Sequence, residues 1–286
     1  MNILLTGATG YVGGFLAAEA RRSGHRLLCL SRHQPADCSD WRPFDLNAPP
    51  VELPPAEALI HAAFDHVPGR YRGGEGDDPA AFLRRNRDGS LALFETAARA
   101  GIRRILFLST RAVYGPQSDT LPLIETTLPA PDTLYGRMKL DVERGLLEMA
   151  GPYLQPTCLR VTGVYGHHRP GHWHKWQDLL ADFEASRTIE PRAGTEVHGL
   201  DLAQAIELLL AAPDAEVSGQ IFNVSDLMLD RRDLLTRYAE IRGIVRALPA
   251  RAATLPDAMN CTKLKALGWR PGGQARLDRF LRELAG

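Results

Sequence analysis

Short apolar runs alternate with amphipathic stretches of helical length through the first 160 of the chain's 286 residues. Five apolar runs predict buried strands, at residues 2–7, 26–31, 57–63, 104–110 and 156–163. Three amphipathic stretches between them predict helices, and each ends in glycine, as a helix C-cap does: 11–24, 79–101 and 133–151. Strands that alternate with helices are typical of a parallel sheet with crossover helices.

This alternation predicts the fold class: α/β, a Rossmann-type doubly wound parallel sheet with helices on both faces. After residue 160 the alternation loosens, which predicts a smaller, mixed C-terminal lobe over residues 161–286, with some segments returning to the core. Two segments break the pattern and are expected to be loops. Residues 65–78 are rich in glycine and charge, and residues 166–178 are rich in histidine and tryptophan.

A glycine-rich turn, TGATGYVGG, joins the first predicted strand to the first predicted helix. Gly7 permits a tight turn, Gly10 lets the backbone approach a pyrophosphate, and Gly13 lets the helix pack close to the sheet. The free N–H groups of the helix N-terminus then favour phosphate. Residues 1–160 are therefore expected to form an NAD(P)-binding domain. Its turn contributes the cofactor-binding residues Gly7, Thr9, Gly10, Tyr11, Val12 and Gly13.

The end of the second predicted strand bears on which dinucleotide binds. An acidic residue there would hold the ribose 2′-hydroxyl of NAD, whereas this chain has Ser31 at that place, followed by Arg32. Because arginine pairs with a 2′-phosphate and an acid would repel it, the sequence favours NADP over NAD. The alternative is that Arg32 is a solvated charge at a strand end. Asp45 and Leu46 are expected at the adenine.

Composition and charge favour a small-molecule ligand. With 34 basic and 34 acidic side chains the net charge is zero, so no long-range field attracts nucleic acid or an anionic membrane. No apolar stretch approaches the roughly 18 residues of a transmembrane helix and no basic leader is present, so a cytoplasmic location is expected. The cysteines follow no metal or redox spacing and are expected to be reduced thiols: Cys29, Cys38, Cys158 and Cys261.

Tyr135 and Lys139 lie four residues apart in the third predicted helix and therefore share one face. Such a pair is common on ordinary helices, so the spacing alone leaves a catalytic and a structural interpretation open. The choice depends on what else the chain supplies to that face.

Seven short segments follow one another along the chain: TGATGYVG, LIHAAF, FLSTRAVYG, YGRMK, LRVTGVYG, EVHGLDLAQAI and TKLKALGWRP. Each is weak alone, but in this order and with about these gaps they resemble the extended short-chain dehydrogenase/reductase family. That family comprises nucleotide-sugar epimerases, dehydratases and reductases. The likeness runs nearly from end to end, and it implies that the C-terminal lobe binds the substrate.

The resemblance implies that Tyr135 is the general acid/base, Lys139 its activator and Thr110 the hydroxyl that completes the site, with hydride passing to or from the nicotinamide. A lysine ammonium and an oxidised nicotinamide stabilise phenolate, which lowers the pKa of tyrosine from about 10 toward neutrality. Tyr135 and Lys139 are also expected at the cofactor. The further cofactor contacts implied by the family are Ala62, Ala63 and Asn86.

Departures from the family's sequence pattern limit which of the family's reactions are expected. Dehydratases of the family place carboxylates directly after the hydroxyl residue, whereas here Arg111 and Ala112 follow Thr110, so an epimerase or a reductase is expected. The substrate is expected to be sugar-type or another small hydroxyl or carbonyl compound. Expected substrate contacts are Arg111, His168, Trp173 and Trp176. Alternatively, the segment 166–178 is a surface loop anchored by its tryptophans. Its histidines match no zinc spacing, so no metal is predicted.

Two alternatives stay open beside the epimerase. A reductase of a nucleotide-linked keto sugar would consume NADPH, whereas an epimerase regenerates its cofactor in each turnover. A non-catalytic NAD(P)-sensing regulator would not need Thr110, Tyr135 and Lys139 together. The resemblance also implies that a homodimer can form through two helices, one of which carries Tyr135 and Lys139.

Overall fold

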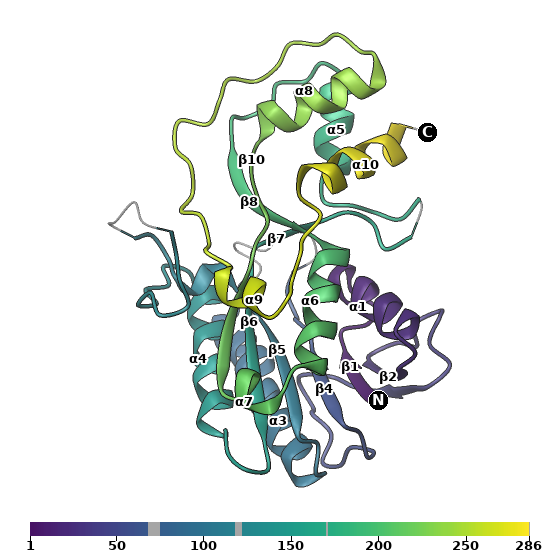
Figure 1. The fold of residues 1–286 in the computed structure, drawn as a ribbon, viewed down its shortest axis with the longest axis vertical. Helices are drawn as coiled ribbons and strands as arrows, with labels where there is room; N and C mark the ends of the chain where they lie inside the picture. Colours follow the sequence, from purple (N-terminus) through teal and green to yellow (C-terminus); the bar gives the residue numbers. More distant parts are fainter. Residues whose placement is uncertain (68–74, 118–121, 170, 286) are drawn as a thin grey trace.

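Seven parallel strands form the main sheet of the computed structural model, which describes residues 1–67, 75–117, 122–169 and 171–285 (Figure 1). Their order across the sheet is β3-β2-β1-β4-β5-β6-β9. The strands are β1 (Asn2–Thr6), β2 (Arg26–Ser31), β3 (Trp41–Pro43), β4 (Ala58–His61), β5 (Arg104–Thr110), β6 (Gln155–Val161) and β9 (Gln220–Val224). The five strands predicted from apolar runs are all present, and the Rossmann-type fold class is confirmed.

Helices cover both faces of this sheet (Figure 1). The main ones are α1 (Tyr11–Arg22), α3 (Gly89–Arg99), α4 (Leu134–Glu148) and α6 (Gly199–Ala211). Successive side chains of a strand point to opposite faces. Ile3 and Leu5 of β1 therefore pack in the core under α1 and α6, whereas Leu4 packs in the core under α3 and α4. Each face buries its own set of apolar residues, as a doubly wound sheet requires.

The predicted helix over 79–101 is divided in the structure. It consists of α2 (Pro79–Leu83), one π-helical turn (Arg84–Asp88) and α3. The predicted loop 65–78 leads into α2, although its residues 68–74 lie outside the described part of the chain. Short elements complete the Rossmann part: a 3-10 turn (Arg111–Val113) and α7 (Asp214–Val217).

A second, three-stranded sheet organises the C-terminal lobe and has the order β10-β8-β7. Because β7 and β8 are parallel while β8 and β10 are antiparallel, the lobe is mixed, as the loosened sequence pattern predicts. Its core contains Tyr165, Trp176, Leu235 and Phe280. The lobe elements are β7 (Gly163–Tyr165), α5 (Gln177–Glu184), β8 (Ala193–His198), β10 (Leu227–Asp230), α8 (Arg231–Arg242) and α10 (Gly273–Ala285). β9 and α9 (Thr262–Ala266) return to the main sheet.

The prediction of four reduced thiols is wrong for one pair, because Cys29 and Cys38 form a disulfide. Pairing of β2 with β3 places Cys29 opposite Trp41, so the connecting loop brings Cys38 back beside β2. The Cα atoms of the two cysteines lie 6.5 Å apart, within the range that a disulfide spans. The spacing of the cysteines in the sequence did not indicate that the chain returns to β2 at Cys38. Separately, no helix within the described ranges is long and apolar enough to cross a membrane.

A buried ion pair ties α4 to β6. The Arg160 Nη2 atom lies 2.8 Å from Glu143 Oε2, and the two side chains are only 3% and 1% exposed. The guanidinium also lies over the ring of Tyr114, at 4.7 Å from its centroid. The pair therefore fixes the helix that carries Tyr135 against the sheet.

We expect Glu143→Ala to lower the free energy of unfolding by about 3–5 kcal/mol, because it leaves the Arg160 charge buried without its partner. Urea denaturation of the parent and variant measures the loss. Glu148→Ala, which removes an exposed carboxylate from the same helix, is the matched control and should change stability by less than about 0.5 kcal/mol. Equal losses in the two variants would contradict the role of the buried pair.

Candidate active site

The glycine-rich turn after β1 leaves no space for side chains. Gly7 has a φ of +75°, and a Cβ there would lie 2.8 Å from backbone atoms of Ala62 and Ala63. A Cβ on Gly13 would collide with the carbonyl oxygen of Gly7. Gly10 donates its N–H to that same oxygen and then caps α1 without a side chain. The first amides of α1 thus lie beside the end of β1, an arrangement suited to a dinucleotide pyrophosphate.

A chain of buried hydrogen bonds links this turn to the neighbouring strand. The Thr6 hydroxyl accepts the N–H groups of Ala62 and Ala63, each at 3.1 Å, and lies 2.7 Å from His61 Nδ1. Burial of the imidazole, with a smaller contribution from the Lys139 charge, lowers the pKa of His61 to about 3. His61 is therefore a neutral structural residue, and the chain just after β4 offers its backbone to the cofactor region.

The same chain of hydrogen bonds continues to the π-helical turn. His61 Nε2 lies 2.9 Å from the Ser90 hydroxyl, which donates to the Asn86 carbonyl. The Asn86 side chain is buried and accepts the Asp65 N–H at 2.8 Å, while its amide donates to the Asp65 carbonyl at 2.8 Å. Asn86 thus holds the segment after β4 in place.

Thr110 and Lys139 come together at the carboxyl end of β5. Thr110 ends the strand, is 8% exposed and accepts the N–H of Ala112. The Lys139 ammonium donates to the carbonyl of Leu108, two residues before Thr110 in β5, at 2.7 Å. It also lies over the rings of Phe107 and Phe64, at 4.5 and 5.5 Å from their centroids.

Tyr135 lies in the first turn of α4. The next residue, Gly136, is in close contact with the segment that follows Thr110. The Thr133 side chain caps the helix by accepting the Gly136 N–H. A Cβ on Gly136 would lie 2.6 Å from the Ala112 carbonyl oxygen, so only glycine lets the helix start against this turn. The Tyr135 ring contacts Phe64 with centroids 5.0 Å apart. The phenol therefore lies in the same region as Thr110 and Lys139.

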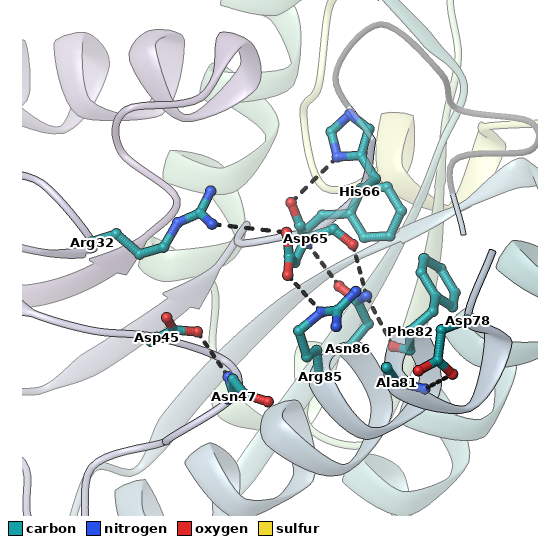
Figure 2. Close-up of polar contacts among 11 residues, drawn as sticks. Arg32, Asp45, Asn47, Asp65, His66, Asp78, Ala81, Phe82, Arg85 and Asn86 are labelled. Carbon is teal, nitrogen blue, oxygen red and sulfur yellow. Dashed lines mark hydrogen bonds and ion pairs between the residues drawn. The ribbon is translucent and has the colours of Figure 1, made fainter. Parts of the chain in front are cut away.

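The predicted adenosine end is more polar (Figure 2). Ser31 donates to the His33 carbonyl, and Arg32 leaves β2 with a side chain that is 64% exposed. Asp45 is exposed and accepts the N–H of Asn47, which closes a local turn. Leu46 is buried, and its carbonyl oxygen lies where a Cβ on Gly89 would be. These residues lie after the ends of β2 and β3, next to the strand that carries the glycine-rich turn.

The residues predicted for substrate contact are not brought together. Arg111 directly succeeds Thr110, and its Nη2 donates to the Asp257 carbonyl at 2.9 Å. Trp173 is half-exposed and lies over Tyr11, with ring centroids 5.2 Å apart. His168 packs on Gly14 and on the ring of Phe15, in a cavity of about 330 Å³ between α1 and α10. Only Arg111 of these lies next to a residue of the catalytic group.

The structure places Trp176 in the core of the C-terminal lobe. It is 6% exposed and stacks on Tyr165 at 4.9 Å between ring centroids. This burial gives Trp176 a packing role, as in the alternative that the loop is anchored by its tryptophans, and its contact with substrate stays a prediction. His198 caps α6 by accepting the Leu200 N–H, and burial lowers its pKa to about 3.

Three residues near the site were missed by sequence reasoning: Phe64, Asp65 and Arg85. Phe64 contacts both Tyr135 and Lys139. Asp65 pairs with Arg85 at 2.7 Å, between Oδ2 and Nε. The signals available were their positions: Phe64 ends the LIHAAF segment, Asp65 begins the predicted loop 65–78, and Arg85 precedes Asn86 in the predicted helix 79–101.

Comparison with known proteins decides the family. The family described as NAD dependent epimerase/dehydratase matches residues 3–225, most of the chain. The chain belongs to this family. The matched region includes the glycine-rich turn, Thr110, Tyr135 and Lys139, so the NAD dependent epimerase/dehydratase assignment covers every candidate catalytic residue.

The chain is similar to proteins that are named for two different reactions. A UDP-glucose 4-epimerase of Rhizobium leguminosarum bv. trifolii is 31% identical over 70% of this chain and 64% of its own length, so the chain spans less than two thirds of that relative. A dTDP-4-dehydrorhamnose reductase of Mycobacterium tuberculosis is 25% identical over 96% of this chain and 88% of its own length.

The fold of the family extends over the whole chain. A solved UDP-glucose-4-epimerase from Stenotrophomonas maltophila, with bound NAD and formylated UDP-arabinopyranose, superposes with a TM-score of 0.80 at 22% identity. The match covers 100% of this chain and 97% of that one. The C-terminal lobe is thus part of the shared architecture.

The buried position of Lys139 gives a testable pH dependence. Burial lowers the pKa of Lys139 to about 7 from an ordinary value of 10.5. Between these values the unfolded chain holds the proton and the folded chain does not, so the stability of the parent rises with pH in this window. Lys139→Met should remove this rise, which amounts to about 1.4 kcal/mol per pH unit for one proton.

The measurement is the free energy of unfolding of parent and variant, from urea denaturation at several pH values between 7.5 and 10. Lys265→Met, which changes an exposed lysine, is the control and should follow the parent. Parallel pH profiles of the parent and Lys139→Met would show that Lys139 does not lose its proton in this range.

Proposed function

We propose that the chain is an NAD(P)-dependent epimerase or reductase that acts on a sugar-type substrate, with Tyr135 as the acid/base. The observation that carries this proposal is the convergence of α4 and β5: Lys139 donates to Leu108 while Gly136 packs on Ala112, so Tyr135 starts its helix beside Thr110. All three groups lie at the carboxyl end of a strand in a doubly wound sheet, where such sheets bind ligands.

The residues present fit a dinucleotide. Gly7 and Gly13 let the turn pack directly against backbone, and the uncapped amides at the start of α1 are the donors that a pyrophosphate needs. When bound, the nicotinamide would supply hydride acceptance and donation at a substrate carbon. In our proposal the Gly-rich turn and Asn86 hold the cofactor, and Lys139 contacts its ribose.

The proton chemistry belongs to three side chains of the chain itself. Tyr135 takes the proton from a substrate hydroxyl as it becomes a carbonyl, and returns it in the reverse step. In its protonated form Lys139 stabilises the phenolate by its charge, and Thr110 donates a hydrogen bond to the substrate oxygen. We infer that residues 161–286 contribute mainly the substrate lobe and residues 1–160 the cofactor and catalytic groups.

NADP is the cofactor that we favour within this proposal. Its support is that Ser31 ends β2 and Arg32 follows it, at the place where an acidic residue would select NAD. The solved relative from Stenotrophomonas maltophila holds NAD, so a preference for NADP would set this chain apart from it. Assembly as a homodimer stays a prediction from the family resemblance.

The catalytic assignment predicts a specific loss in Tyr135→Phe. Turnover of UDP-galactose to UDP-glucose, monitored by product analysis, should fall at least about 100-fold because the proton carrier is removed. Affinity for NAD and NADP, measured by titration calorimetry, should change less than about twofold. Tyr153→Phe, at a tyrosine that is 87% exposed, is the matched control and should keep full activity. Undiminished turnover in Tyr135→Phe would contradict the acid/base role.

Cofactor stoichiometry separates an epimerase from a reductase. If the chain is an epimerase, UDP-sugars interconvert with no net change in absorbance at the reduced nicotinamide band. If it is a reductase, a nucleotide-linked 4-keto sugar consumes one NADPH for each product formed. The similarity to both kinds of relative motivates the comparison. If cofactor binds but neither reaction occurs with any such substrate, the cofactor-sensing regulator becomes the better account, even though Thr110, Tyr135 and Lys139 favour catalysis.

A further inference from the structure

An ion-pair cluster of Arg32, Asp65 and Arg85 lies beside the predicted dinucleotide site (Figure 2). Strands β2 and β4 flank β1, and Thr6 at the end of β1 pairs with Leu30 on one side and His61 on the other. Arg32 directly follows β2, and Asp65 follows β4 by four residues. Their contact therefore passes beside the turn that starts from the middle strand.

Asp65 presents one carboxylate oxygen to each arginine. Its Oδ2 lies 2.7 Å from Arg85 Nε, and its Oδ1 lies 3.9 Å from Arg32 Nη1. In Figure 2 the two guanidinium groups approach Asp65 from different sides. Two cations from separate elements, the end of β2 and the π-helical turn, thus converge on one anion.

The anion is held by its backbone rather than by these pairs. Asn86, which is 2% exposed, bonds both the N–H and the carbonyl of Asp65 at 2.8 Å. The side chains of Arg32, Asp65 and Arg85 are 64%, 27% and 31% exposed. Ion pairs this open to solvent contribute little to the stability of the fold. A stronger anion can therefore replace the carboxylate without disturbing the fold.

The charges of the cluster suit a phosphate better than a hydroxyl. Two guanidinium groups against one carboxylate leave one net positive charge, and a phosphate monoester offers three acceptor oxygens to both arginines. In a Rossmann fold the end of β2 is where the 2′-position of the adenosine ribose lies. A 2′-phosphate there would meet the two cations together with a fixed carboxylate that repels it.

From this geometry we propose that Arg85 binds the 2′-phosphate together with Arg32, and that Asp65 is an internal anion that opposes it. When the adenosine ribose carries a 2′-hydroxyl, as in NAD, Asp65 pairs with the two arginines. When the ribose carries a 2′-phosphate, as in NADP, Asp65 competes with that phosphate for them. The chain's preference between NADP and NAD is therefore set by three residues from three segments. This inference rests on the proposed dinucleotide site, but not on catalysis.

Titration calorimetry with NADP⁺ and NAD⁺, which differ only in the 2′-phosphate, tests the roles of Asp65 and Arg85 on the full-length protein freed of nucleotide. Asp65→Asn should tighten binding of NADP⁺ about tenfold, the scale of one charged contact, and change binding of NAD⁺ less than about twofold. The substitution keeps the size of the side chain and the backbone bonds to Asn86. Arg85→Ala should weaken NADP⁺ about tenfold with little effect on NAD⁺, as should Arg32→Ala.

Arg87→Ala is the matched control, because Arg87 lies on the same π-helical turn but pairs with Asp88. It should leave the affinities for both nucleotides unchanged, and thermal unfolding of each variant reports whether it is folded. An unchanged ratio of the two affinities in Asp65→Asn, or equal effects of Arg85→Ala and Arg87→Ala, would overturn the inference while the dinucleotide site stands. If the parent binds neither nucleotide, the proposed function itself fails.

Discussion

The hydrogen-bonded chain from Thr6 through His61 to Ser90 and Asn86 is the interaction on which the rest of the site depends. It joins the end of β1, the end of β4 and the π-helical turn before α3, three segments that are distant in sequence. Because each group in the chain is buried, an unmade bond would cost about 1–3 kcal/mol, and this fixes a single arrangement. The glycine-rich turn, the backbone after β4 and the anchoring of Asp65 all depend on it.

Much of the fold could be predicted because each of these strands has a signal in its own short stretch of sequence. The runs that became β1, β2, β4, β5 and β6 are continuous and apolar, as strands buried on both faces must be. The turn at Gly7 and Gly13 could also be predicted, because only glycine fits where two backbone segments are in close contact. The pair Tyr135 and Lys139 was found by its helical spacing together with its order in the family's segments. These are signals contained within a few residues.

The features that could not be predicted depend on contacts between distant segments. Cys38 meets Cys29 because β3 pairs with β2, and nothing in the spacing of the cysteines reveals that return. Trp176 looked like a residue of an open loop, but the packing of α5 against α10 and β7 buries it. Asp65 and Arg85 are separated by twenty positions, and their pairing results from the anchoring of Asp65 by Asn86. From the sequence, Asp65 was expected in the loop 65–78 and Arg85 in the helix 79–101, with no indication that they meet.

The return of β9 to the main sheet has a consequence for how the chain can be divided. β9 pairs with β6 from Thr157↔Gln220 to Val161↔Val224. The lobe strands β7 and β8 lie between these two strands in the sequence. A fragment that stopped at residue 160 would therefore expose β6 as a bare edge, although all seven of its residues are buried in the full chain. Exposed apolar edges recruit other strands and aggregate. The N-terminal half should be handled in the laboratory only together with the segment that covers it.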